Sequence, residues 1–434
     1  MKVYDYSTKS AQERLRRIME RGSDYSARDY RQVEAILKDV RRNKDRAVEK
    51  YTQRFDAPTL TAERFRVTAG EIREAGRQVE ARFRRALSRA IRQIEKFHQA
   101  QQERSWINTD RPGVVVGQQV TPVDSAGIYV PGARGGETPL VSTVLMGAAP
   151  ARQAGVPKIV MVTPPRKDGS VNPHLLVAAD KAGVSEIYKV GSAWAIAALA
   201  YGTETIPKVD MIAGPGNKFV VLAKKMLSGR VGIDIIAGPS EILIVADHTA
   251  EPRYLAADLL SQAEHDALAS AVLLTPVRQI AERTAREVSA QLSALSRRET
   301  AEKALTAYGG IFVVDTMETA LSIANRYAPE HLELQVDNPF ACLGGIRHAG
   351  AVFLGRYTPE PIGDYVAGPN HTLPTGGCAR FASALSTSHF LKKTSLVYYS
   401  REALRAEAGD AMQLAGIEGL GAHANAIRVR LEGD

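Results

Sequence analysis

Residues 159–201 read IVMVTPPRKDGSVNPHLLVAADKAGVSEIYKVGSAWAIAALAY. Apolar runs stand at 159–162 and 187–190, and each is followed by glycine or proline and then by an alanine-rich segment, at 174–183 and 193–201. Short apolar runs between turn residues are typical of buried strands, and alanine-rich segments favour helices. Strands that alternate with helices predict βαβ units and a parallel sheet covered on both faces.

The same alternation continues on both sides of this stretch. Further runs of strand type stand at residues 114–116, 128–130, 211–213, 242–245, 272–274, 311–314, 332–336 and 352–354. In residues 1–105, by contrast, apolar side chains recur at the three- and four-residue spacing of helices. We expect an α/β fold of two Rossmann-like parallel-sheet domains, one inserted into the other between about residues 129 and 238. A helical N-terminal region precedes them, and a short tail from about residue 401 has little core of its own.

Composition narrows the class of protein. At 434 residues the chain is long enough for two or more domains. Its hydrophobic share of 44% and charged share of 24% are those of an ordinary globular protein. No apolar run reaches the roughly 18 residues of a membrane span, the first residues lack a signal-peptide core, and two cysteines exclude a disulfide framework. We expect a cytoplasmic protein without a membrane partner.

The formal charge of +8 raises the question of nucleic-acid binding. Residues 1–110 hold 26 Lys and Arg against 17 Asp and Glu, so the excess lies in the N-terminal quarter. There the basic residues are mixed with acidic ones through helical sequence, and aromatic residues for base stacking are not interleaved. This pattern favours a solvated helical surface, and we expect no nucleic-acid partner.

Several polar segments carry residues suited to chemistry. Residues 257–266 are expected to form a helix, in which Gln262 and His265 stand three residues apart on one face. This pair could be half of a metal site, or it could be part of an ordinary solvated surface. Glu330 and His331 adjoin before a predicted strand, where a histidine can act as general base and a glutamate can activate water. A surface Glu-His pair is the alternative.

Two later segments add similar side chains. The loop 363–371 contains Asp364 and His371, although Asp364 could serve only an Asx turn, and the tail adds Glu418 and His423. Together with Gln262 these residues make a zinc site of nitrogen and oxygen ligands, without thiolate, reasonable.

Two glycine-containing turns follow predicted strands, at residues 129–132 (YVPG) and 214–217 (GPGN). A helix that begins after such a turn offers free N–H groups and a positive dipole end to an anion such as a pyrophosphate. Neither turn has the G-x-G-x-x-G pattern, and tight-turn chemistry explains them equally well.

Taken together, the segments resemble the L-histidinol dehydrogenase family. The matching stretches are YTQRFD at 51–56, GPSEIL at 238–243, SQAEHD at 261–266, YAPEHLEL at 327–334, GDYVAGPNHTLPT at 363–375 and EGLGAH at 418–423. Their order agrees with the family, and the similarity runs nearly from end to end.

The resemblance implies a zinc-dependent, NAD-linked enzyme that oxidises L-histidinol to L-histidine through L-histidinaldehyde, in the last steps of histidine biosynthesis. It also implies aldehyde-dehydrogenase-like domains and a homodimer with shared active sites. The implied ranges are 1–128 for the N-terminal helical region leading into the first α/β domain, 129–238 for the inserted nucleotide-binding domain, 239–400 for the remainder with the metal and catalytic site, and 401–434 for a tail that reaches the partner subunit.

Site roles follow from the same resemblance. By position, the zinc ligands would be Gln262, His265, Asp364 and His423, and the catalytic pair would be Glu330 and His331. Substrate contacts would come from Ser240, His371 and Glu418, together with the zinc ligands and His331. Tyr129 and Asn217 match positions that touch the nucleotide.

The departures from the family pattern lie on the cofactor side. Trp194 stands where the family usually has a glutamine that contacts the nucleotide, which suggests that its ring stacks on the nucleotide, and the loop 132–139 is unusual in wording. The main alternative is a paralogous NAD-dependent dehydrogenase of another small alcohol, such as a sulfopropanediol. A zinc hydrolase with Glu330 as base and a nucleic-acid binder using the basic helices are the other classes.

Overall fold

The computed structural model describes residues 1–22, 25–133 and 136–432, and it divides into two compact units. The first unit consists of Met1–Gln101 and Asp124–Phe390, and the second of Gln102–Val123 and Leu391–Asp434. Within the described ranges, no helix has both the length and the apolar character needed to cross a membrane.

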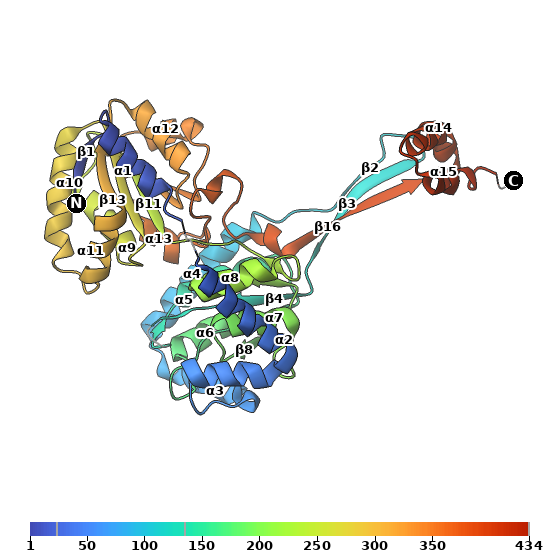
Figure 1. Ribbon diagram of the computed structural model, residues 1–434, viewed down its shortest axis with the longest axis horizontal. Coiled ribbons are helices and arrows are strands. Elements are labelled where there is room, and N and C mark those ends of the chain that lie inside the picture. Colours follow the sequence, from blue (N-terminus) through green and yellow to red (C-terminus); the bar gives the residue numbers. More distant parts are fainter. Residues whose placement is uncertain (23–24, 134–135, 433–434) are drawn as a thin grey trace. The chain divides into compact units, whose positions relative to one another are not determined.

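A six-stranded parallel sheet forms one half of the first unit (Figure 1). Its strands, in spatial order, are β1 (Val3–Asp5), β13 (Gly309–Val313), β12 (Ser270–Thr275), β11 (Glu241–Ala246), β14 (His331–Gln335) and β15 (Ala351–Leu354). The helices of this half are α1 (Lys9–Met19), α9 (Pro252–Ala263), α10 (Arg278–Leu292), α11 (Arg298–Tyr308), α12 (Met317–Tyr327) and the short α13 (Glu360–Tyr365). The short 3₁₀ turn η2 (Pro339–Gly345) lies between β14 and β15, and the turns η3 (Cys378–Arg380) and η4 (Thr387–Phe390) follow α13 in the chain.

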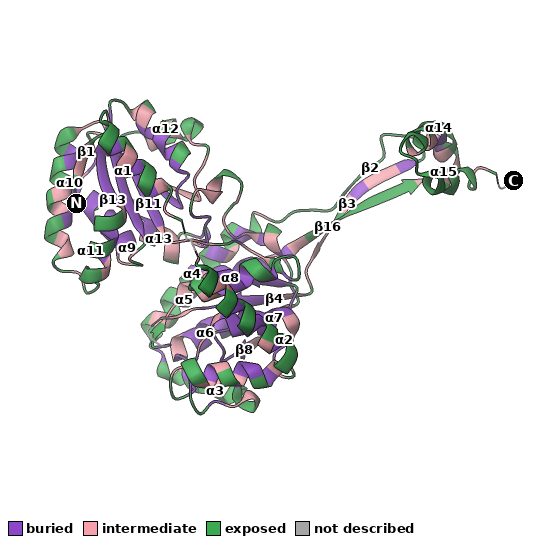
Figure 2. Cartoon of the chain, viewed as in Figure 1, coloured by how far each residue is buried: buried purple, intermediate pink, exposed green. Residues whose placement is uncertain are grey.

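The core of this sheet follows from the two-residue period of a strand. On β11, Ile242 and Ile244 pack with α9 and α10, whereas Leu243 and Val245 pack on the opposite face with α1 and α12. All six residues of β11 are buried, and the central strands are purple in Figure 2. Burial on both faces explains why the strands read as continuous apolar runs.

A five-stranded parallel sheet forms the other half of the first unit. Its strands, in spatial order, are β10 (Gly232–Ile233), β9 (Met211–Ala213), β4 (Ser125–Tyr129), β7 (Lys158–Val162) and β8 (Glu186–Tyr188). Its helices are α2 (Ala27–Phe55), α3 (Ala69–Gln78), α4 (Ala81–Gln99), α5 (Val141–Gln153), α6 (Pro173–Ala182), α7 (Ser192–Tyr201) and α8 (Lys218–Leu227). The turn η1 (Ala62–Arg64) and the hairpin β5 (Gly132–Ala133) with β6 (Thr138–Pro139) complete it.

The strand order of this sheet contains a topological switch point. From β4 the chain goes outward to β7 and β8 on one side, and then returns to β9 and β10 on the other side. Open α/β sheets bind ligands in the crevice at the carboxyl ends of the two strands that flank such a point, here β4 and β9.

The N-terminal segment is not wholly helical. Strand β1 pairs in parallel with β13, with Val3 opposite Ile311, and α1 contributes Leu15 and Ile18 to the core of the six-stranded sheet. A strand of three residues is too short to show a two-residue period, and its pairing partner lies about three hundred residues further along.

The second unit is built around antiparallel strands. Strand β3 (Val114–Pro122) pairs with β2 (Trp106–Asn108) and with β16 (Leu391–Tyr399), and helices α14 (Arg401–Ile417) and α15 (Gly421–Arg428) follow. Residues 114–116 were expected in a parallel sheet, and the antiparallel pairing of β3 with β16 corrects that expectation. Because of this pairing, the second unit contains residues 102–123 as well as the tail, whereas the predicted tail range was 401–434 alone. Much of this unit is coloured as exposed in Figure 2. Its exposed residues include large apolar ones, namely Ile107, Val397, Tyr398, Leu414 and Ile417.

Candidate active site

The predicted catalytic pair, Glu330 and His331, lies where two neighbouring strands begin. His331 is the first residue of β14 and pairs with Ile242 of β11, so Glu330 and Glu241 stand side by side at the amino edge of the sheet. The proline at position 329 and the left-handed backbone of Ala328 (φ 52°) turn the chain from α12 into this strand. The site is therefore built at strand starts, not at the carboxyl ends where α/β sheets usually bind ligands.

His331 is held as a neutral imidazole. Its Nδ1 lies 2.9 Å from the carbonyl oxygen of Glu241, which can only accept, so Nδ1 donates and Nε2 is left without a proton. Burial lowers the pKa of His331 to about 4. At neutral pH the side chain can therefore accept a proton through Nε2.

Glu330 is buried beside it. Its Oε2 accepts the backbone N–H of Glu241 at 2.9 Å and lies 3.6 Å from His331 Nδ1. Burial raises the pKa of Glu330 well above its ordinary value, and the negative charges of Glu241 and Asp364 act in the same direction. A carboxyl group with a raised pKa is suited to proton transfer near neutral pH.

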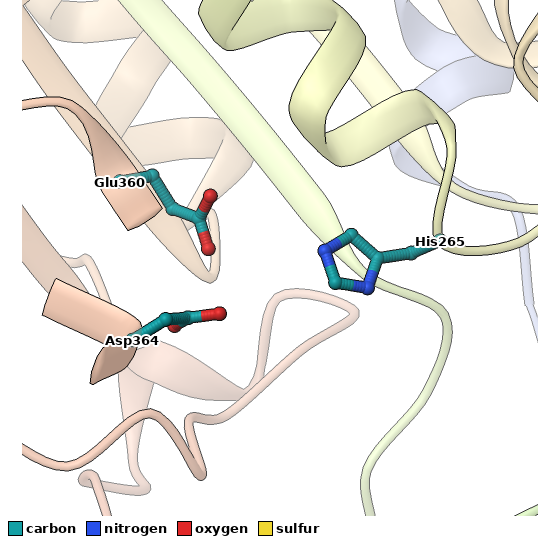
Figure 3. A group of neighbouring side chains, drawn as sticks. All are labelled: His265, Glu360 and Asp364. Atoms are coloured by element: carbon teal, nitrogen blue, oxygen red, sulfur yellow. The ribbon is translucent and has the colours of Figure 1, made fainter. Parts of the chain in front are cut away.

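A second group of side chains can hold a metal ion. One ligand atom from each of His265, Glu360 and Asp364 lies within 4.8 Å of the other two, and the two carboxylates point toward the imidazole in Figure 3. Gln262 is 1% exposed, and its Oε1 has no hydrogen-bond partner among the described residues. Imidazole nitrogen with amide and carboxylate oxygens is a donor set that divalent metal ions accept.

The helix that carries Gln262 ends earlier in the chain than expected. Helix α9 ends at Ala263 and Glu264 is its C-cap, so His265 lies in the following turn and not on the same helical face as Gln262. The backbone N–H of His265 still donates to the carbonyl oxygen of Gln262 at 3.2 Å. This turn keeps both residues beside one cavity.

Sequence reasoning missed Glu360. It is 1% exposed at the start of α13, and its Oε1 lies 3.8 Å from His331 Nε2. Burial raises its pKa, and Asp364 adds to the effect. The sequence did contain a clue to this residue: Glu360 and Asp364 are four apart, and one turn of helix places such residues on the same side.

One cavity joins these groups. It contains about 850 Å³ of empty space, including space open to solvent. It is lined by Ser240, Gln262, His265, Glu330, His331, Glu360, Asp364 and His371, together with residues of both halves of the first unit, such as Thr143 of α5. His371 Nδ1 lies 3.8 Å from Asp364 Oδ1, and burial lowers the pKa of His371. Seven of the nine residues predicted for metal binding, substrate binding or catalysis therefore line this cavity. The other two, Glu418 and His423, belong to the second unit. There Glu418 caps α14 and His423 lies on α15, both exposed.

The predicted nucleotide residues lie at the switch point of the other sheet. Tyr129 ends β4, is 2% exposed, and accepts the backbone N–H of Ser192 with its hydroxyl at 3.0 Å. Asn217 is the N-cap of α8, where its side chain accepts from the N–H groups of Phe219 and Val220. Both residues thus lie at the carboxyl ends of two neighbouring strands, Tyr129 on β4 and Asn217 after β9.

Trp194 corrects an expectation. Its side chain is 4% exposed and stacks with the rings of Tyr51 and Phe55, at centroid separations of 5.8 and 5.7 Å. Its Nε1–H donates to Thr52 Oγ1 at 3.1 Å. The ring is part of the packing between α2 and α7, so the hypothesis that it stacks on a nucleotide is wrong. The other unusual segment, 132–139, includes residues 134–135, which lie outside the described residues.

Comparison with known proteins gives a consistent result. A family model described as "Histidinol dehydrogenase" matches residues 19–431. A histidinol dehydrogenase of Desulfotalea psychrophila is 56% identical over 92% of each chain, and one of Thermosynechococcus vestitus is 52% identical over 96% of each. The crystal structure of a histidinol dehydrogenase from Elizabethkingia anophelis is similar with a TM-score of 0.93 and 39% identity, over 100% of this chain and 98% of that one.

Proposed function

The chain belongs to the histidinol dehydrogenase family and is an oxidoreductase of histidine biosynthesis. We propose that it oxidises L-histidinol to L-histidine through L-histidinaldehyde, and that two NAD molecules accept the hydrides. One observation carries the proposal. The unprotonated Nε2 of His331 shares a cavity with the amide of Gln262, the imidazole of His265 and the carboxylate of Asp364.

We propose that Gln262, His265, Asp364 and His423 hold zinc. The partnerless oxygen of Gln262 and the closeness of His265 to Asp364 support this set, and Glu360 is a further donor within reach. Bound zinc would polarise and position the substrate without redox chemistry of its own, so the hydride goes to NAD.

The catalytic pair would act in two steps. In the first, His331 Nε2 removes the proton of the substrate hydroxyl while hydride leaves the carbon that carries it, which gives the aldehyde. In the second, the Glu330 carboxylate takes a proton from the water that attacks the aldehyde. The resulting hydrate anion then transfers its hydride to the second NAD, which leaves the carboxylic acid of L-histidine. The raised pKa of Glu330 makes it basic enough for this task.

Substrate recognition would rest on the acidic groups of the cavity. The carboxyl groups of Glu330, Glu360 and Asp364 line it, and a ligand with an amino group and a basic ring, as L-histidinol has, would favour their ionised forms. Ser240, His371 and Glu418 would complete the substrate contacts.

The cofactor and subunit assignments are proposals of the same kind. Tyr129 and Asn217 would contact NAD at the switch point, where α8 presents its N-terminus. The exposed apolar side chains of the second unit support a homodimer in which Glu418 and His423 enter the active site of the partner. The likeness of the domains to aldehyde dehydrogenases stays a prediction.

The test is the number of NADH molecules formed per L-histidinol. Zinc-loaded protein with excess NAD should form two, and both His331→Asn and removal of zinc by a chelator should abolish the reaction. Added zinc should restore the chelated protein but not His331→Asn. No NADH from folded, zinc-loaded protein would contradict the proposal and direct attention to other small alcohols.

A further inference from the structure

Arg21 follows α1 and has a side chain that is 4% exposed. Its Nη2 lies 2.9 Å from Glu241 Oε1, and its Nη1 donates to the Tyr327 hydroxyl at 3.2 Å. Its Nε donates to the carbonyl oxygen of Leu268 at 3.1 Å. One guanidinium thus connects the end of α1 with the starts of β11 and β12 and with the end of α12, just before the catalytic pair.

Glu241 continues the connection to both catalytic residues. Its side chain accepts from Arg21, from the N–H of Gly376 at 3.0 Å and from the N–H of Glu330 at 3.2 Å. These donors favour the ionised carboxylate and oppose the burial that raises the pKa of Glu241. Its main chain donates to Glu330 Oε2 and accepts from His331 Nδ1, both at 2.9 Å. Both catalytic side chains are therefore held by the backbone of the residue that Arg21 anchors.

We infer that the buried Arg21–Glu241 ion pair is a positioning device for Glu330 and His331, which fixes the tautomer of His331 and balances the charge beside Glu330. The inference rests on the proposed roles of these two residues. Arg21 touches neither the cavity nor the reacting atoms, and it acts through Glu241.

The charges around Glu330 set the direction of the expected effects. Glu241 on β11 and Asp364 and Glu360 on α13 oppose its ionisation, whereas Arg21 favours it, and His331 lies beside it uncharged. Arg21→Met leaves the charge of Glu241 unbalanced, so the acid limb of the activity profile should move to higher pH. Glu241→Gln removes that charge and should move the limb to lower pH.

The experiment compares these variants with Arg16→Met, which removes an exposed arginine of α1 that pairs with Glu13 and Glu20. For Arg21→Met and Glu241→Gln we expect kcat to fall between roughly tenfold and a hundredfold, as for a misplaced catalytic group, while KM for NAD stays within about twofold. Arg16→Met should behave as wild type. If Arg21→Met does not fold, Arg21→Lys should give a smaller shift in the same direction.

A second measurement does not need the reaction. In protein labelled with ¹⁵N-histidine, the resonances of His331, assigned through His331→Asn, should report the Nδ1–H tautomer in wild type and Arg16→Met and a mixture in Arg21→Met. Acid limbs that do not move in opposite directions, or a His331 tautomer unchanged in every variant, would overturn the inference. A wild-type protein inactive on L-histidinol would overturn the proposed function alone, and the spectra would then decide the inference.

Discussion

Glu330 is the residue whose protonation separates the two halves of the proposed reaction. Glu330→Gln keeps the shape of the side chain but cannot accept a proton, so oxidation should stop after one NADH per L-histidinol. Because burial raises the pKa of Glu330, the active carboxylate is lost as the pH falls through a value above the usual 4.5. Oxidation of added L-histidinaldehyde should decline below a correspondingly high pH, and the variant should be slower by roughly a hundredfold or more. An acid limb at or below pH 4.5 would contradict this assignment.

Trp194 gives a second prediction for a single residue. Trp194→Gln removes a buried ring that stacks with Tyr51 and Phe55 and leaves a polar amide among apolar side chains, so the free energy of unfolding should fall by about 3 kcal/mol or more. KM for NAD should change little, in contrast to a residue that stacks on the nucleotide. Denaturant unfolding of this variant and of Phe340→Gln, whose ring is 69% exposed, provides the comparison. Equal stability of the two variants would refute the packing role.

Single positions were the hardest to predict from the sequence. Gln262, His265, Glu330, His331 and Asp364 were named, and the structure places them around one cavity. Glu360 was missed because a carboxylate near a proline looks like an ordinary helix start, and its burial depends on β14 and its neighbours. Trp194 was misjudged because its environment is made by α2, about 140 residues earlier in the chain.

At the scale of elements, the turn after β9 depends on the backbone of one glycine. Gly214 has φ +119°, and a Cβ there would lie 2.2 Å from the carbonyl oxygen of Tyr129. Gly214→Ala should therefore separate this turn from the end of β4, lower the free energy of unfolding by about 1–3 kcal/mol, and raise KM for NAD. Gly70→Ala, on α3, is the matched control, because a Cβ there would lie 3.6 Å from its nearest neighbour, Thr68 Oγ1. This variant should be neutral or slightly stabilising. Wild-type values for Gly214→Ala would argue against a nucleotide site at this turn.

Elements were predicted well where their pattern is local. The parallel strands β4, β7, β8, β9 and β11 to β15 were found because each is an apolar run, whereas the two-residue parallel strand β10 was not. Strand direction and very short strands were not, since β3 was expected to be parallel and β1 was hidden in a region of helical spacing. Both depend on partners distant in sequence, which periodicity does not reveal.

For the whole molecule, the question is where the residues of the second unit act. This unit has a small core, with Ala403, Ala408 and Ala424 buried in its two helices, and it exposes Leu414 and Ile417. A surface of this kind is suited to cover by another chain, and the proposed dimer supplies one.

Mixing two inactive variants distinguishes the alternatives. His331→Asn damages the first unit and His423→Asn the second, so each homodimer should be inactive. If every site combines the first unit of one subunit with the second unit of its partner, a mixed dimer contains one site with both histidines intact. Unfolding and refolding an equal mixture should then restore about a quarter of the wild-type activity, because half of the dimers are mixed and one of their two sites is intact. If His423 serves the site of its own subunit, every site carries one of the two substitutions and the refolded mixture stays inactive.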